Sequence, residues 1–381
     1  MTAVSRSRGW AVRKFWRFAT IYGPGRTFMK AAGRLRIRLP RGLRPARPRD
    51  IGVIGCGQFA FATIGYFLRS SGHDIKACFD VSAEARDTFA RSMRVPRACA
   101  SADEVLSDPD VRTVYIASNH ASHAAYAAAA VQRGLAVYVE KPIAVSSEQL
   151  DVLQRSVRAG ARIFAGYNRP FSAAICALRA QLKVDSAAGI TLQCFVSGHR
   201  IPADHWYRLP EEGTRICGNV GHWLDLFVHV LMWRSLPDRL DIALAWASDE
   251  ERDDNLAVTI TSDRGDLFSV MLTSRCEPFE GINETINFQH ADTICKIDDF
   301  RRMAVWQDFR LWQRRFWPKD AGHRLAILQP FRSDRQRDWR EVVLSTLLML
   351  HIADMIRGGI KRSDFSFRAS SGRLSEEIKS R

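Results

Sequence analysis

Residues 51–60 read IGVIGCGQFA. The first four are apolar and mostly β-branched, which is typical of a strand buried on both faces of a parallel sheet. The first glycine that follows allows a tight turn, the second lets backbone approach a pyrophosphate, and the alanine permits close packing of a helix whose first amides meet the phosphates. The stretch therefore predicts a dinucleotide-binding turn. Its expected cofactor contacts are Gly55, Gly57, Gln58, Phe59 and Ala60.

Asp80 follows a second apolar segment, 75–79, and stands 25 residues after the first glycine of the turn. A carboxylate at about this distance hydrogen-bonds the adenosine ribose hydroxyls in dinucleotide-binding folds. Neither chain neighbour of Asp80 is Arg or Lys, so NAD is favoured over NADP as the cofactor. The alternative is a solvated carboxylate at the end of a strand.

Residues 111–142 repeat the strand–helix unit. Two predicted strands, 114–117 and 136–139, flank an alanine-rich helix. Strands that alternate with helices form a parallel sheet, and ligands bind beyond the carboxyl ends of its strands. The motif Glu140-Lys141-Pro142 follows the second strand, so we expect Lys141 at the ligand edge; the alternative is a surface lysine.

The second half of the chain predicts a different sheet. After a helix over 171–182, several strands follow with few helices between them, which indicates an open antiparallel sheet. The predicted strands are 190–197, 241–247, 256–262, 266–273, 284–290 and 293–298. In residues 301–319 basic and aromatic side chains alternate, which we interpret as an amphipathic helix, with a lipid-facing patch as the alternative.

The predicted fold class is α/β, with two domains. An N-terminal Rossmann domain would carry a doubly wound parallel sheet, and a C-terminal α/β domain a mostly antiparallel open sheet. The expected divisions are a basic aromatic leader (1–49), an NAD-binding domain (50–168), a substrate and oligomerisation domain (169–365) and a tail (366–381).

The charge of the chain is concentrated in the leader, residues 1–49. The whole chain carries +15, while residues 1–50 hold 14 Lys or Arg and one Asp. Three interpretations compete: contact with an anionic membrane surface, nucleic-acid binding, and a tail that packs on its own protein or stays disordered. Because the rest of the chain is nearly neutral, no specific nucleic acid is expected. In the enzyme interpretation, deletion of 1–49 should leave catalysis intact.

Cysteine usage and hydropathy indicate a cytoplasmic protein, with a peripheral position at the inner face of a membrane as the alternative. The eight cysteines form no CxxC pair, so we expect reduced thiols and no metal site. No apolar run is long enough for a transmembrane helix, and the leader lacks the apolar core of a secretory signal.

His222 is the candidate acid–base residue of the second half. A histidine can exchange a proton near neutral pH, and Asp225 at i+3 faces the same side of a helix, where it could orient the ring or hold a substrate hydroxyl. Taken alone, a histidine near a helix start is more often structural. Arg215 and Arg169 stand in predicted loops and could bind a phosphate or carboxylate, or pair with surface acids instead.

Four motifs in order give the chain a resemblance to the Gfo/Idh/MocA oxidoreductases. They are GCGQFA at 55–60, ASHA at 121–124, EKP at 140–142 and GYNR at 166–169. The resemblance implies hydride transfer between a nicotinamide and a ring carbon of a sugar or cyclitol, with Lys141 and His222 as catalytic residues. It also implies cofactor contacts from Ser118, Asn119, His123, Glu140 and Lys141, and substrate contacts from Asn168, Arg169, Arg215, Asn219 and Asp225.

One departure from the family pattern concerns residue 218. Many members carry Asp four residues before the histidine, where this chain has Gly218, followed by Asn219. The motif Asp298-Asp299-Phe300-Arg301 resembles one that recurs in a branch of the family, the oxidoreductase halves of two-domain proteins associated with polysaccharide synthesis. We expect a homo-oligomeric enzyme acting on a sugar or nucleotide sugar in cell-surface polysaccharide synthesis. The alternative is a non-catalytic NAD-binding scaffold, tethered to a membrane or assembly by its leader.

Overall fold

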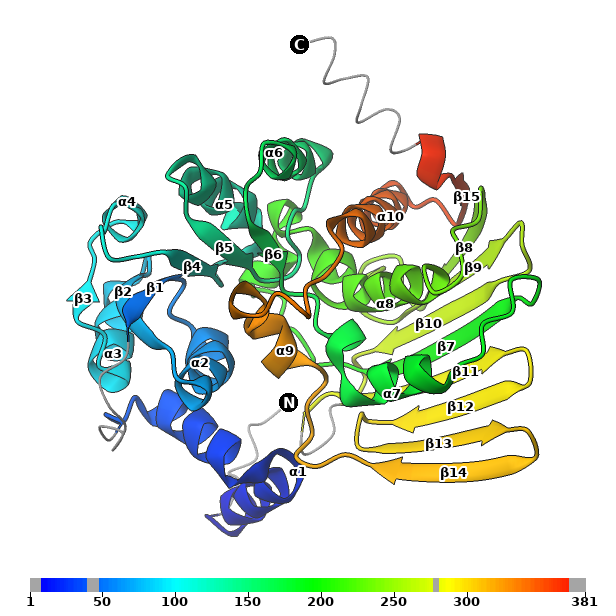
Figure 1. Ribbon diagram of the computed structural model, residues 1–381, viewed down its shortest axis with the longest axis horizontal. Helices are drawn as coiled ribbons and strands as arrows, with labels where there is room; N and C mark the ends of the chain where they lie inside the picture. Colours follow the sequence, from blue (N-terminus) through cyan, green and yellow to red (C-terminus); the bar gives the residue numbers. More distant parts are fainter. Residues whose placement is uncertain (1–7, 40–47, 277–280, 370–381) are drawn as a thin grey trace.

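The computed structural model describes residues 8–39, 48–276 and 281–369. Two sheets lie side by side, each with its own helices (Figure 1). The first contains six strands in the order β3-β2-β1-β4-β5-β6, all paired in parallel. This order is that of a Rossmann fold, and it confirms the predicted doubly wound sheet. The strands are β1 (Arg49–Ile54), β2 (Asp74–Phe79), β3 (Arg97–Ala98), β4 (Thr113–Ile116), β5 (Ala136–Val139) and β6 (Ile163–Ala165).

The glycine turn connects β1 to a helix that begins with a wide turn. Residues Ala60–Ile64 (η1) are π-helical and continue into α2 (Gly65–Ser71). Gly55 has φ 93°, and a Cβ there would lie 2.4 Å from the backbone of Ala117, so only glycine fits the turn. The remaining helices of this domain are α3 (Ala83–Met93), α4 (Ala102–Leu106), α5 (His123–Gln132) and α6 (Ser147–Arg158).

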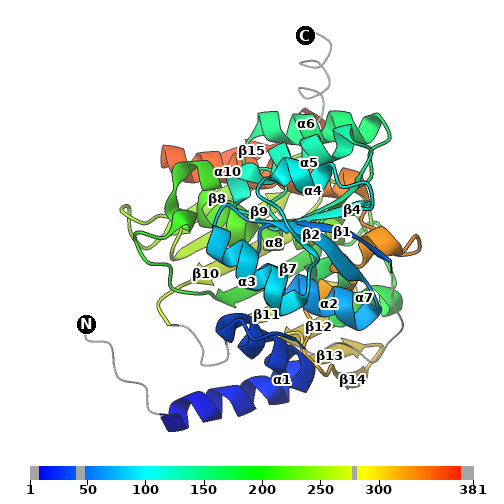
Figure 2. The same ribbon diagram turned by 90° about the vertical axis from the view of Figure 1, so that its left-hand side faces the viewer.

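The second sheet has nine strands in the order β14-β13-β12-β11-β7-β10-β9-β8-β15. Only the β7–β10 pair is parallel, which confirms the mostly antiparallel prediction. Three helices pack on one face of the sheet (Figures 1 and 2): α7 (Ala173–Gln181), α8 (Gly221–Leu231) and α10 (Trp339–Gly358). The strands are β7 (Ile190–Ser197), β8 (Leu240–Trp246), β9 (Leu256–Ser262), β10 (Leu267–Thr273), β11 (Asn283–His290), β12 (Thr293–Asp298), β13 (Arg302–Gln307), β14 (Arg310–Arg315) and β15 (Arg362–Phe365).

The helix predicted over 301–319 is wrong. Residues Arg302–Gln307 and Arg310–Arg315 form the hairpin β13–β14 at the edge of the sheet. On β13 buried apolar positions recur every second residue, which is the period of a strand and not of a helix. On β13, Met303 and Val305 point into the core while Arg302 and Trp306 are exposed.

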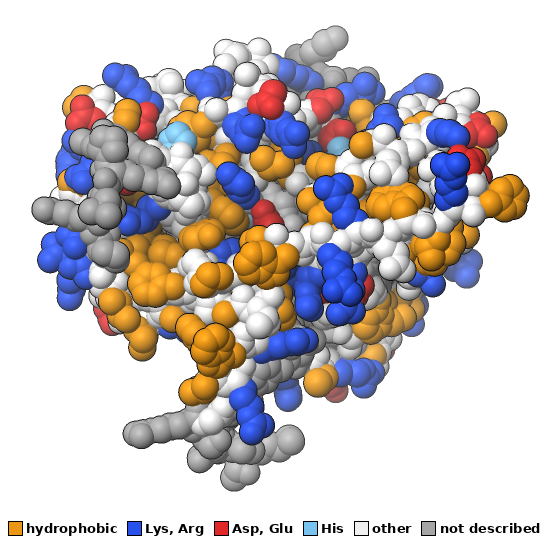
Figure 3. Space-filling model, turned by 60° about the horizontal axis from the view of Figure 1, so that its bottom comes forward, with side chains coloured by type: hydrophobic (Ala, Val, Ile, Leu, Met, Phe, Trp, Pro, Cys, Tyr) orange, Lys and Arg blue, Asp and Glu red, His pale blue; other side chains and the backbone are white. Residues whose placement is uncertain are grey.

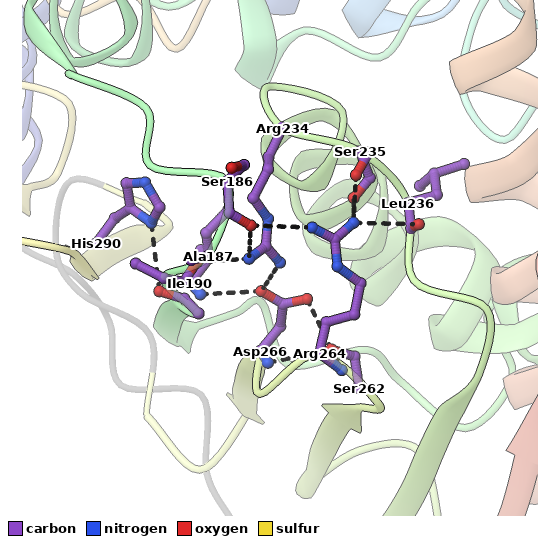
Figure 4. Close-up of polar contacts among 12 residues, drawn as sticks. Ser186, Ala187, Ile190, Arg234, Ser235, Leu236, Ser262, Arg264, Asp266 and His290 are labelled. Carbon is purple, nitrogen blue, oxygen red and sulfur yellow. Dashed lines mark hydrogen bonds and ion pairs between the residues drawn. The ribbon is translucent and has the colours of Figure 1, made fainter.

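A buried ion pair fastens the end of α8 to the sheet (Figure 4). Arg234 Nη2 lies 2.6 Å from Asp266 Oδ1, and both side chains are buried. The same carboxylate accepts the amide of Ile190 at 2.9 Å and the hydroxyl of Ser262 at 2.7 Å. Asp266 therefore joins the start of β7, the β9–β10 turn and the segment after α8.

The described part of the leader packs on its own protein. Helix α1 (Arg8–Leu35) is broken at Gly23 and Pro24 and lies beneath both domains (Figure 2). Lys319 donates its amide to Ile21 O at 2.8 Å, and Trp317 Nε1 donates to Thr20 O at 3.0 Å. Farther along, the amide of Leu39 donates to Ser92 O on α3 at 2.9 Å. Within the described ranges, no helix combines the length and apolar character that a membrane span requires.

Candidate active site

A cleft of about 710 Å³ lies where the carboxyl ends of the Rossmann strands face the second domain. The glycine turn forms one wall, and the start of α8 contributes to another. Most of the predicted site residues are brought together there. Those lining the cleft are Gly57, Gln58, Phe59, Ser118, His123, Glu140, Lys141, Asn168, Arg169, Asn219 and His222.

Lys141 follows β5 and points across the cleft to the other domain. Its Nζ donates a hydrogen bond to Gly218 O at 2.7 Å. Burial lowers the pKa of Lys141 to about 8; the charge of Glu140 opposes this change and that of Arg169 adds to it. The Lys141 amine is therefore mostly protonated at pH 7 and about half protonated at pH 8.

His222 stands in the first turn of α8, directly after the π-helical turn Ile216–Val220 (η6). Burial holds the pKa of His222 well below its usual range, and the cations Arg169 and Lys141 lower it further. Its Nδ1 is buried and has no hydrogen-bond partner among the described residues. A neutral imidazole with a vacant ring nitrogen can accept a proton from a ligand.

Glu140 lines the cleft beside Lys141 and fixes its backbone. Its Oε1 accepts the hydroxyl proton of Tyr138 at 2.7 Å, and its Oε2 accepts the amide of Lys141 at 3.2 Å. Burial raises the pKa of Glu140 to about 7, although the bond from Tyr138 lowers it. The pKa of the Glu140 carboxyl group therefore lies close to that of the neighbouring Lys141.

His123 ties two cofactor-side loops together. Its Nδ1 lies 2.7 Å from Pro142 O and its Nε2 3.1 Å from Ser118 O. Burial lowers the pKa of His123 to about 4, so the ring is neutral at pH 7. The imidazole fixes the end of β4 against the segment that carries Lys141.

Asp80 braces the glycine turn. Its Oδ2 accepts the amide of Cys56 at 2.7 Å, and its Oδ1 accepts that of Ser82 at 2.8 Å. The leader also reaches this turn, because Arg36 Nη2 donates to Cys56 O at 3.3 Å. The sequence around Asp80 shows no neighbouring cation, whereas the tertiary structure brings Arg36 to the glycine turn that Asp80 holds.

Two predicted substrate residues do not face the cleft. Asp225 is fully buried, with Arg337 donating to both of its oxygens at 2.8 and 3.0 Å and Ser345 donating at 3.0 Å. It therefore orients neither His222 nor a ligand here. Arg215 is also buried, and its Nη1 donates to Asp254 Oδ1 at 2.9 Å. Both side chains serve interior ion pairs whose partners lie far away in the sequence.

Besides Asp80, three predicted cofactor residues lie outside the cleft lining. Gly55 packs against the backbone of Ala117, and Ala60 is buried in the core. Asn119 Nδ2 donates to Glu212 Oε1 at 2.5 Å, which ties the Rossmann domain to a loop before α8.

The remaining predicted ligand contacts surround His222. Arg169 pairs with Glu284, and its guanidinium lies 4.8 Å from the Trp223 ring centroid. Asn168 Nδ2 donates to Ala321 O at 2.7 Å. Asn219 Oδ1 is buried and has no partner among the described residues. The amide of Asn219 is thus available to a ligand hydroxyl.

Tyr207 occupies the space beside Gly218. A Cβ added at Gly218 would lie 1.8 Å from Tyr207 Oη, so the tyrosine leaves no room for a side chain there. Tyr207 lines the cleft, and its hydroxyl makes no hydrogen bond to another described residue. Sequence reasoning missed it, because its loop, Asp204 to Tyr207, carries no regular spacing.

His323 was also missed as a site residue, although Gly322-His323 stands out in the sequence. Its ring centroid lies 6.0 Å from that of Phe59, on the cofactor side of the cleft. Burial lowers the pKa of His323, while the carboxylate of Asp320 opposes this effect. Among the described residues, no three His, Cys, Asp or Glu side chains gather as metal ligands would.

The glycine turn fits a dinucleotide. A Cβ at Gly57 would meet no atom within 4 Å, so open space lies over the turn. The fold and the site define a dinucleotide-binding protein with a lysine and a histidine at the ligand edge.

Comparison with known proteins finds a family match for the Rossmann domain. Residues 49–167 match the family model "Oxidoreductase family, NAD-binding Rossmann fold" of Gfo/Idh/MocA proteins. The match covers the Rossmann domain, which is the part of the chain that is similar to the Gfo/Idh/MocA oxidoreductases. It is similar to inositol 2-dehydrogenase of Acidothermus cellulolyticus, with 31% identity over 158 residues, which are 40% of this chain and 45% of the relative. The matched region thus spans under half the length of this curated relative.

Solved structures share the whole fold. The WlbA dehydrogenase of Bordetella pertussis, solved with NADH and UDP-GlcNAcA, has a TM-score of 0.66 at 18% identity, over 84% of this chain and 99% of that one. GenD2 from gentamicin A biosynthesis, solved with NAD, has a TM-score of 0.67 at 16% identity, over 86% and 99%. At these identities the likeness establishes the fold.

Proposed function

We propose that this chain is an NAD-dependent oxidoreductase that transfers a hydride to or from a ring carbon of a sugar. The observation that carries the proposal is the placement of Lys141 and His222 in one cleft with the glycine turn. A nucleotide sugar of cell-surface polysaccharide synthesis is the proposed substrate. WlbA, solved with UDP-GlcNAcA, supports a nucleotide sugar as the substrate class.

The proposed reaction needs one hydride acceptor and one proton acceptor. The glycine turn would hold NAD, whose nicotinamide would supply the hydride acceptor for the carbon that bears the hydroxyl group. Neutral His222 accepts the hydroxyl proton, and the Lys141 ammonium stabilises the developing alkoxide. Asn168, Arg169 and Asn219 hold the sugar. In the reverse direction the protonated histidine returns the proton to the carbonyl oxygen.

A panel of UDP-sugars, free sugars and cyclitols tests the activity, with NADH formation followed by absorbance. We expect Lys141→Met and His222→Ala each to lower kcat by about a hundredfold or more, with the affinity for NADH nearly unchanged. The matched control is His199→Ala, which removes another histidine of the cleft that has no role in the proposed reaction. Full turnover in both active-site variants would refute these roles. Tight NADH binding without turnover of any compound would favour the scaffold alternative.

We also propose that the outer face of the leader contacts an anionic membrane surface. Val12, Phe15 and Trp16 are 55%, 47% and 65% exposed and follow the i, i+3, i+4 spacing of one helix face. Arg13 and Arg17 are exposed beside them, and hydrophobic and basic side chains alternate across the underside of the molecule (Figure 3). Such a face suits the boundary of an anionic bilayer.

Vesicle flotation tests this contact. We expect the chain to float with phosphatidylglycerol vesicles and not with phosphatidylcholine vesicles, and Phe15→Ser with Trp16→Ser to abolish flotation. Phe309→Ser, at an exposed phenylalanine between β13 and β14, is the control and should float normally. Equal flotation of the double variant would exclude the outer face as the contact.

A homo-oligomer is proposed through the helix-free face of the second sheet. Alternating side chains on this face are exposed: Phe195, Leu267, Met271, Ile294 and Trp306. Such a patch is a candidate interface. Light scattering after gel filtration should give more than one chain per particle, and Met271→Arg should reduce the mass to that of a monomer.

A further inference from the structure

Two segments outside the four sequence motifs also line the cleft. They are α1, through Phe18, Tyr22, Arg26 and Lys30, and a loop of the second domain, through Trp206 and Tyr207. The loop reaches the proposed catalytic residues, because Tyr207 lies against Gly218, whose carbonyl oxygen accepts a hydrogen bond from Lys141 at 2.7 Å. Tyr207 therefore places a hydroxyl group against the residue that anchors Lys141.

Contacts from both domains hold the loop that carries Tyr207. The loop ends at Glu212, whose side chain is buried. From the Rossmann domain, the amide of Ala121 donates to Glu212 Oε2 at 3.1 Å. Within the second domain, Arg208 Nη2 donates to Asp254 Oδ2 at 2.9 Å. The backbone around Tyr207 is therefore fixed relative to both walls of the cleft.

Aromatic neighbours fix the ring of Tyr207, and its hydroxyl is unpaired. The ring centroid lies 4.7 Å from that of His120 and 5.0 Å from that of Trp206, both edge to face. The amide of Tyr207 donates to His205 Nδ1 at 3.2 Å, whereas the hydroxyl makes no hydrogen bond within the described ranges. Burial raises the pKa of Tyr207, although the charge of Arg215 opposes this effect. The hydroxyl therefore keeps its proton at neutral pH and can donate it to a ligand oxygen in a hydrogen bond.

Asn219 provides the complementary acceptor. It directly follows Gly218 and lines the cleft, and its Oδ1 is buried without a partner among the residues that the structure describes. A buried polar atom that stays unpaired costs about 1–3 kcal/mol. A sugar hydroxyl both accepts and donates hydrogen bonds, so one such group can satisfy the phenol of Tyr207 and the amide oxygen of Asn219 together.

This donor and acceptor stand next to the proposed catalytic pair. His222 follows Asn219 by three residues, where the π-helical turn η6 continues into α8, and residues at this spacing share a helix face. Lys141 and Tyr207 approach the same residue, Gly218. The cleft therefore offers two adjacent positions for hydroxyl groups, one at Lys141 and His222 and the other at Tyr207 and Asn219.

We propose that Tyr207 and Asn219 bind a second hydroxyl group of the substrate, on the ring carbon next to the one that is oxidised. Tyr207 donates a hydrogen bond to the oxygen of this group, and Asn219 Oδ1 accepts one from it. The substrate is thereby a sugar with a vicinal diol. This inference rests on the sugar oxidation proposed above and assigns the contacts of one further hydroxyl group.

Binding titrations on the full chain test this diol subsite, with NADH present so that no oxidation occurs. The ligands are UDP, UDP-glucose and the monodeoxy analogues of UDP-glucose that each lack one ring hydroxyl. In the wild-type chain, loss of either of two adjacent hydroxyl groups should weaken binding about tenfold. Tyr207→Phe should weaken UDP-glucose about three- to tenfold and leave UDP unchanged.

Coupling between the variant and the analogues identifies the contact. For one of the two adjacent hydroxyl groups, its removal should cost clearly less affinity in Tyr207→Phe than in the wild-type chain, because the hydrogen bond is already lost. Asn219→Ala should show coupling to the same hydroxyl group. Tyr126→Phe, which removes a hydroxyl from α5 outside the cleft lining, is the matched control and should leave every affinity unchanged.

Several results would overturn the proposal. They are additive losses without coupling, an equal loss of UDP affinity in Tyr207→Phe, an unchanged affinity for UDP-glucose in that variant, and a wild-type chain that binds none of the sugars. Failure of the proposed function gives a different result. A chain that shows the coupling but forms no NADH with NAD and any sugar retains the diol subsite and refutes the oxidation.

Discussion

At the scale of single residues, burial sets the charges of Lys141 and His222, the proposed catalytic pair. Removal from water disfavours the charged form of both Lys141 and His222, but the two groups start from different ordinary values. The pKa of Lys141 falls to about 8, whereas that of His222 falls well below its usual range. The proposed pair therefore consists of one cation, Lys141, and one neutral base, His222, at pH 7, as alcohol oxidation requires.

The first residue-scale prediction concerns pH. Alkoxide stabilisation needs protonated Lys141, so kcat/KM for sugar oxidation should decline as the pH rises through about 8. Lys141→Arg, which keeps its charge at all accessible pH values, should lose activity but show no decline in this range. A pH–rate profile of both proteins is the measurement. If kcat/KM of the arginine variant declines above pH 8 in the same way, the decline is caused by another titrating group.

The second residue-scale prediction concerns Gly218. Gly218→Ala places a methyl group in the volume of the Tyr207 hydroxyl, so we expect a loss of about 1–3 kcal/mol in the free energy of unfolding. Tyr207→Ala should remove most of this penalty in the double variant. Chemical denaturation of the two single variants and the double variant measures the coupling. Additive effects would show that the two residues do not share this space.

At the scale of elements, the edge hairpin and α8 show where local pattern succeeds and fails. The hairpin β13–β14 carries charges and aromatics on a solvated edge, so hydrophobic periodicity is weak there. On α8 the period is clear, yet its polar residues divide between two environments. His222 faces the cleft, and Asp225 faces Arg337 just before α10.

The element-scale prediction follows from this ion pair. Asp225→Asn removes the bidentate carboxylate partner of the buried Arg337 guanidinium and leaves Glu341 as its other carboxylate partner, which should cost about 1.5–3 kcal/mol of stability. Asp354→Asn, on exposed α10 surface beside Arg357, should cost less than about 0.5 kcal/mol. Thermal unfolding compares them. A stable Asp225→Asn protein with a raised KM would instead restore the substrate role first expected for Asp225.

At the scale of the whole molecule, the leader joins the two domains. Its buried side chains Ile21, Met29 and Leu39 lie in the protein interior, and its backbone accepts or donates hydrogen bonds to both domains. The expectation that the leader is dispensable for catalysis therefore changes, because the same helix provides a wall of the cleft.

Deletion of residues 1–38 tests this whole-molecule role. Exposure of the apolar surface beneath α1 should lower the melting temperature by several degrees, and loss of the cleft wall that α1 provides should weaken ligand binding. Differential scanning fluorimetry and NADH titration are the measurements, and a deletion of residues 1–7 is the control. A truncated chain with native stability and affinity would return the leader to a separate tethering role.

The sequence by itself determined the Rossmann strands, the glycine turn and the position of Lys141, because these depend on local period and on a turn geometry that only glycine permits. It also predicted the open antiparallel sheet and the cleft position of His222. The tertiary structure alone decided which polar residues face the cleft. Asp225 and Arg215 are taken by Arg337 and Asp254, while Tyr207 and the leader enter the site from distant segments. A buried charge binds whichever partner the fold brings to it, and spacing along the chain does not encode that partner.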